Sequence, residues 1–221
     1  AGSSPAEDPF GGRMKSLTTL WGSHPSSYGA GMRIAMTGST DLQAAKAQPD
    51  RSATYPNTDL GRAMAAVART LRADVGVATV TVDQGNWDMH SNLGTATAGE
   101  LVTNARDLSG SIAAFFADLG TVADKVTLVT ISEFGRRVQE NGSRGLDHGW
   151  GNVMLLAGAG VKGGRYYGTW PGLTNQTDSD LTVTTDYRSV LSEIVTTRMG
   201  ASSAAVFPGF APEPIGVMSA L

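Results

Sequence analysis

Asp88 and His90 are a pair of residues whose types and spacing suggest metal chemistry. One residue separates them, so on an extended backbone both side chains point the same way. A carboxylate oxygen and an imidazole nitrogen can then bind one divalent cation, as in protein zinc sites. The alternative is a structural role, because Asp is common for backbone reasons in turns that follow a strand.

A second polar cluster contains Glu133, Arg136 and Arg137. Glu133 supplies another carboxylate, and a guanidinium offers a forked set of donors that suits an oxyanion such as phosphate or sulfate. A surface ion pair is the alternative for both arginines. We favour the ion pair for Arg137, and for Arg136 both interpretations stay open.

His148 is the third candidate, because it follows Asp147 and glycine comes directly after it. Glycine permits a close approach of the backbone to a ligand. The chain has three histidines, and two of them, His90 and His148, lie on either side of Glu133 in the sequence. The third, His24, lies in a loop of Gly, Ser and Pro without other candidate ligands. A structural role is the alternative for His148.

Composition narrows the classes of function. The chain has 221 residues, enough for one sizeable domain, with 17 Lys and Arg against 20 Asp and Glu. Its net charge of −3 gives no electrostatic reason to expect nucleic acid or an anionic membrane as partner. It has no cysteine, so any metal must bind His, Asp, Glu or Asn. No apolar run approaches the roughly 18 residues of a membrane-spanning helix, so we expect no membrane span.

Short apolar runs lie next to the three polar clusters, and the first two of these runs are rich in β-branched residues. Residues 77–82 precede the Asp88 cluster, residues 126–131 precede Glu133, and residues 153–157 follow His148. Such runs are typical of buried strands in a parallel sheet. Because ligands bind beyond the carboxyl ends of such strands, we expect the clusters to converge at one edge of the sheet.

Helical patterns alternate with these runs. Apolar spacing predicts a helix over 60–71 capped by Asn57 or Thr58, a second over 97–119 that stops at Gly120, and a third after Asp186. Alternation of this kind indicates an α/β domain with a mostly parallel sheet. Residues 1–57 are loosely patterned, so we predict an N-terminal segment over 1–57 and the α/β domain over 58–221.

Several short motifs resemble the DUF1501 family, a set of largely uncharacterised bacterial proteins related to the alkaline phosphatase and sulfatase superfamily. The segments that carry the resemblance are 85–90, 132–136, 141–142, 147–149, 184–188 and 207–209. The resemblance implies an alkaline phosphatase-like α/β/α sandwich with metal ligands on loops at one edge of the sheet. Many members are exported through the twin-arginine route, which implies an extracytoplasmic (periplasmic or secreted) location.

The resemblance implies a metal-dependent hydrolase of a phosphate or sulfate ester. Asp88, His90, Glu133 and His148 would bind a divalent metal, and Arg136 would contact the oxyanion of the small ester. Carboxylate and imidazole ligands suit Zn or Mn better than an all-oxygen Ca or Mg site. The chain departs from the superfamily at Phe134, which offers no ligand atom to the second metal of a phosphatase-like pair.

A second departure lies at the start of the chain. Family members open with a strand and Gly-Gly-x-Asp, the superfamily nucleophile also lies upstream, and residues 1–55 match neither element. We therefore expect the C-terminal part of a longer precursor, accompanied by an N-terminal companion polypeptide that covers an unpaired strand or apolar face. A divergent complete protein is the alternative.

The same departures leave a second function open. The chain would then be a non-catalytic extracytoplasmic binding or assembly protein on a degenerate sulfatase-like scaffold. Ser91, Ser132 and Ser143 are the hydroxyls within or beside the motifs, and none has a recognisable activating base nearby in the sequence. We therefore expect oxyanion binding, with weak or no ester hydrolysis by the isolated chain.

Overall fold

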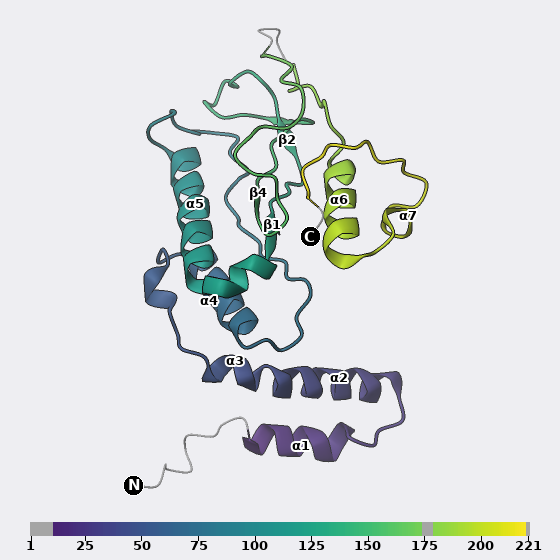
Figure 1. Cartoon of the computed structure of the whole chain (residues 1–221). Coiled ribbons are helices and arrows are strands. Elements are labelled where there is room, and N and C mark those ends of the chain that lie inside the picture. The colour runs from purple at the N-terminus through teal and green to yellow at the C-terminus, as the bar shows by residue number, and fades with distance from the viewer. Residues whose placement is uncertain (1–10, 174–178, 220–221) are drawn as a thin grey trace.

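The computed structural model describes residues 11–173 and 179–219, and helices account for most of its regular structure (Figure 1). None of the helices in these ranges combines the length and the apolar character needed to cross a lipid bilayer. The elements are, in order, α1 (Gly11–Trp21), α2 (Ser27–Asp41), α3 (Gln43–Ala47), η2 (Ser52–Thr54), α4 (Asp59–Arg72), α5 (Glu100–Leu119), η3 (Gly120–Lys125), β1 (Thr127–Val129), β2 (Gly135–Arg136), β3 (His148–Gly149), β4 (Leu156–Gly158), α6 (Tyr187–Met199) and α7 (Ser203–Val206).

Helices α4 and α5 pack together and form the larger core. The hydroxyl of Thr58 caps α4 by accepting the backbone N–H of Gly61 at 3.0 Å. The buried face of α4 meets Phe115 and Leu119 of α5, which are each 3% exposed. Helix α5 ends at Gly120, where φ is +56° and glycine has no steric penalty. The predictions of both helices and of the glycine stop are confirmed.

The strands β1 and β4 form an antiparallel pair with Thr127 opposite Gly158. Adjacent residues of β1 point to opposite faces. Leu128 packs against the core of α4 and α5, whereas Val129 packs against a second core that contains Val190 and Ile194 of α6. Helices therefore lie on both sides of this small sheet (Figure 1).

Asp186 caps helix α6, as expected, because its carboxylate accepts the backbone N–H of Arg188 at 2.8 Å. About two turns further on, Glu193 binds the C-terminal segment. Its carboxylate accepts the four consecutive backbone N–H groups of 215–218, at 2.6–3.2 Å. Charge-assisted hydrogen bonds of this kind hold Val217 and Met218 in the second core.

The strands β2 and β3 form the second antiparallel pair, and this pair carries two of the candidate site residues. Arg136 lies opposite His148, and Gly135 lies opposite Gly149. A Cβ atom at Gly135 would lie 2.2 Å from the carbonyl oxygen of Gly151, so glycine is required for this close approach.

The predicted strand over 77–82 does not form. This segment has no strand partner in the described parts of the chain, and Val77 and Val80 are 38% and 45% exposed. The two sheets within those parts are both antiparallel pairs. The mostly parallel sheet and the alkaline phosphatase-like sandwich stay predictions.

The helices α1 and α2 form a hairpin that lies apart from the rest of the molecule (Figure 1). Helix α3 connects this hairpin to α4, and Arg69 of α4 donates to the carbonyl oxygen of Gln48 at 2.9 Å. The loosely patterned N-terminal segment thus contains the helices α1, α2 and α3. The proposed division of the chain at residue 57 stays a prediction.

A buried carboxylate joins the end of α5 to the segment before α4. Asp118 is 5% exposed and accepts hydrogen bonds from the hydroxyl of Tyr55 at 2.8 Å and from Arg51 at 3.1 Å. The side chain of Arg72, which is 8% exposed, also pairs with it. Because both charges of the Arg72–Asp118 pair are buried, each depends on the other to offset the loss of hydration.

We predict that Asp118→Ala lowers the free energy of unfolding by about 3–5 kcal/mol, because Arg72 keeps a buried charge without its partner. Urea denaturation followed by circular dichroism would measure this change. The matched control is Asp59→Ala, which removes an exposed ion pair with Arg62 and should leave stability nearly unchanged. Equal effects of the two substitutions would contradict the prediction.

Candidate metal centre

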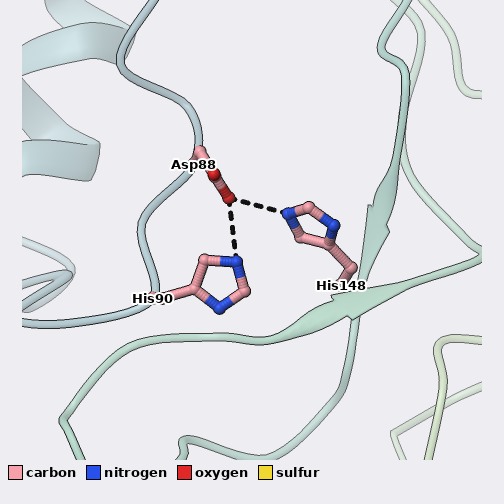
Figure 2. Close-up of side chains that lie close together, drawn as sticks. All are labelled: Asp88, His90 and His148. Atoms are coloured by element: carbon pink, nitrogen blue, oxygen red, sulfur yellow. Dashed lines mark hydrogen bonds and ion pairs between the residues drawn. The ribbon is translucent and has the colours of Figure 1, made fainter.

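Three side chains from two distant parts of the chain converge at the β2–β3 pair (Figure 2). One carboxylate oxygen of Asp88, Oδ1, lies 2.9 Å from Nε2 of His90 and 2.7 Å from Nε2 of His148. Each residue offers one potential ligand atom, and these atoms all lie within 4.8 Å of one another. A carboxylate oxygen and two imidazole nitrogens are a common protein donor set for a transition metal.

Asp88 and His90 lie in the loop between α4 and α5, and an alternation of side chains directs them outward together. Met89 between them is 3% exposed and points into the protein. This loop is attached to the segment before β3, where Leu146 donates its backbone N–H to the carbonyl oxygen of Met89 at 3.1 Å. A Cβ atom at Gly145 would lie 2.1 Å from the carbonyl carbon of His90, so this contact requires glycine.

Arg136 connects the same two loops with its guanidinium group. One terminal nitrogen donates to the carbonyl oxygen of Leu146 and the other to that of Trp87. Its Nη2 atom is also 3.9 Å from Oδ1 of Asp88. Burial lowers the pKa of Arg136, and the charges of Asp88 and Asp147 oppose this shift. The residue predicted to contact an oxyanion therefore holds the backbone next to Asp88.

Phe134 fixes the ring of His148 by stacking. The two rings lie 4.0 Å apart between centroids at an interplanar angle of 9°. The ring of His90 lies on the same histidine at 4.7 Å and 40°. Phe134 offers no ligand atom, but its position keeps the imidazole of His148 in the orientation in which Nε2 faces Asp88.

Hydrogen bonds from the two histidines stabilise the charged form of the carboxylates. The bond from His148 is the main cause that lowers the pKa of Asp88, and the charges of His90 and Arg136 add to it. The pKa of Asp147 is lowered in the same way by hydrogen bonds from His90 and from Asn141. Both carboxylates are therefore ionised at neutral pH and available as anionic partners.

The cluster is open to solvent. The side chain of Asp88 is 63% exposed, and those of His90 and His148 are each 46% exposed. An ion or small ligand can reach these atoms without a rearrangement of the fold.

The structure brings together three of the four predicted metal ligands. Glu133 is exposed and lies outside the group of Asp88, His90 and His148. Sequence reasoning assigned no role to Asp147 or Asn141, although both belong to the motifs that carry the family resemblance. Asp147 bonds to Nδ1 of His90 at 2.8 Å, and the amide of Asn141 donates to Asp147 at 2.9 Å.

The chain matches the family described as protein of unknown function (DUF1501) over residues 23–215, and it belongs to this family. The match includes the whole cluster of Asp88, His90 and His148. Searches of the curated proteins and of the solved structures returned no match.

We predict that His148→Ala raises the pKa of Asp88 toward its ordinary value, because the main hydrogen bond to the carboxylate is lost. A carboxylate with a lowered pKa stabilises the folded protein above the usual Asp pKa of about 3.9, and this contribution disappears as the pH falls through the lowered pKa. A carbon-13 NMR titration of the Asp88 carboxyl in metal-free protein would measure the shift. Glu133→Ala is the control and should leave this titration unchanged.

Proposed function

We propose that this DUF1501 protein is an exported, metal-dependent hydrolase that acts on a small phosphate or sulfate ester. One divalent cation, Zn or Mn, would be held by Asp88, His90 and His148. The observation that carries the proposal is the convergence of one carboxylate oxygen and two imidazole nitrogens within 4.8 Å.

The donor set and its surroundings fit such a cation. Nitrogen and carboxylate oxygen ligands favour Zn or Mn over Ca or Mg. Three protein ligands leave a coordination position open, as in catalytic rather than structural zinc sites. The exposure of all three side chains gives substrate access to that position. Glu133 is not among the ligands of this proposal, because its carboxylate lies outside the group.

The bound cation would supply Lewis acidity, which polarises the ester and stabilises the charge that develops in the transition state. Phe134 and Arg136 position the groups that this chemistry needs. Phe134 holds the ring of His148, and Arg136 keeps a positive charge 3.9 Å from Asp88. Each terminal nitrogen of Arg136 carries a second hydrogen, so a guanidinium that already bonds two carbonyl oxygens can still donate to an oxyanion.

The non-catalytic alternative also has a specific observation in its favour. The apolar run 77–82 has no strand partner among the described residues and is largely exposed. An unpaired segment of this type is suited to pairing with another polypeptide, such as the expected N-terminal companion. On this reading, the protein binds a cation and an oxyanion but does not turn over esters.

We predict that the metal-free full chain binds one Zn or Mn ion, measured by isothermal titration calorimetry with metal analysis. His90→Ala and His148→Ala should each weaken binding by more than the roughly 10–100-fold that loss of an outer hydrogen-bond partner costs. His24→Ala is the matched control and should bind as the wild type does, because His24 contacts Trp21 and Ser26 instead. Equal binding by all three variants would exclude this site.

An assay of ester hydrolysis distinguishes the hydrolase from the non-catalytic binding or assembly protein. We expect at most weak hydrolysis of an aryl phosphate or an aryl sulfate by the isolated chain with added Zn or Mn, and we expect Asp88→Asn to abolish it. His24→Ala should retain the wild-type rate. Metal binding without hydrolysis of either ester would favour the binding or assembly protein, and hydrolysis that survives Asp88→Asn would contradict the proposed site.

A further inference from the structure

We infer that Asp147 and Asn141 are positioning residues that orient His90, so that Nε2 of its ring is the nitrogen available to a cation. This inference rests on the proposed metal site and assigns to it two residues that are not ligands. Both lie in the segment between β2 and β3, far in the sequence from the histidine that they contact.

The ring of His90 lies between two carboxylates. Its Nδ1 atom is 2.8 Å from Oδ1 of Asp147, and its Nε2 atom is 2.9 Å from Oδ1 of Asp88. A neutral imidazole has one N–H, so it can donate to one of these oxygens only. The other nitrogen then directs its lone pair at a carboxylate oxygen. A cation bound between this nitrogen and the oxygen relieves their repulsion.

The hydrogen bonds of Asn141 determine which nitrogen of the His90 ring keeps the proton. The amide oxygen of Asn141 accepts the backbone N–H groups of Ser143 at 2.9 Å and Gly145 at 3.0 Å. Its Nδ2 atom must therefore face the opposite way, where it donates to Oδ1 of Asp147 and to the carbonyl oxygen of His90, each at 2.9 Å. Asp147 is thus held at a fixed place against the ring.

Asp147 is the better-fixed of the two carboxylates. Each oxygen has a second partner, the amide of Asn141 for Asp147 and Nε2 of His148 for Asp88, but the side chain of Asp147 is 44% exposed against 63% for Asp88. The proton of a neutral His90 therefore belongs on Nδ1, where it bonds to Asp147. The lone pair on Nε2 then faces Asp88 and His148, the two other proposed ligands.

This arrangement also affects the second histidine. Asp147 directly precedes His148, so one short segment orients His90 and delivers the third ligand. A carboxylate on the far nitrogen of a metal-binding histidine fixes its tautomer and raises its basicity, and its loss costs roughly 10–100-fold in metal affinity.

The test uses the full chain with two isosteric substitutions. Asp147→Asn removes the charge and lets the new amide donate to Nδ1, which favours the wrong tautomer. Asn141→Asp keeps the oxygen that accepts from Ser143 and Gly145 but replaces the donor to Asp147 with an acceptor. Ser143→Ala is the control, because it changes an exposed side chain of the same loop and leaves the backbone contacts intact.

Zinc titration of the metal-free proteins gives the first readout. We expect Zn affinity to fall by roughly 10–100-fold in Asp147→Asn and Asn141→Asp, and to stay at the wild-type value in Ser143→Ala. Wild-type affinity in Asp147→Asn would overturn the inference while leaving the metal site itself intact.

Nitrogen-15 NMR of the metal-free proteins, at a pH where the ring is neutral, gives a readout that does not depend on metal. His90 should carry its proton on Nδ1 in the wild type and on Nε2 in Asp147→Asn. The same tautomer in both proteins would overturn the inference. A change of tautomer in a chain that binds neither Zn nor Mn would support the positioning role and reject the proposed function.

Discussion

The candidate site depends on the hydrogen bonds that the guanidinium of Arg136 donates. This group donates to the carbonyl oxygens of Trp87 and Leu146, the residues directly before Asp88 and Asp147. A partly buried cation needs such acceptors, and two loops far apart in the sequence supply them. Once these carbonyls are fixed, Asp88 faces His148 and Asp147 faces His90. The convergence of the ligand atoms is therefore a consequence of backbone positions that one side chain holds.

The rest of the fold gives this arrangement a rigid support. The strands β1 and β4 lie between two cores, one built on α4 and α5 and the other on α6. The carboxylates of Asp118 and Glu193 link these helices to segments before α4 and after α6. Because sites on rigid elements are more precise than sites on free loops, the tethered loops of the cluster benefit from this support.

Local patterns in the sequence predicted the local features of the fold. The caps at Thr58 and Asp186 and the stop at Gly120 depend on neighbours within a few residues, and all three are present. The segment 77–82 was expected as a strand because of its β-branched composition. Strand formation also needs a partner from elsewhere in the chain, and composition alone does not reveal that partner. For the same reason the sequence suggested Asp88, His90 and His148 but not the bond between His90 and Asp147.

The charges around the cluster explain why a cation and an oxyanion belong to one proposal. The positive charges of Arg136 and Arg137 act on Asp88 and Asp147, respectively. The carboxylate of Asp180 lies beside Gly149 of the same strand pair, so three negative charges face two positive charges while both histidines are neutral. A divalent cation adds two positive charges at a solvent-open position, and the sum then favours a negatively charged ligand. The recognition of a phosphate or sulfate group by this site would therefore depend on the metal and not on the arginines alone.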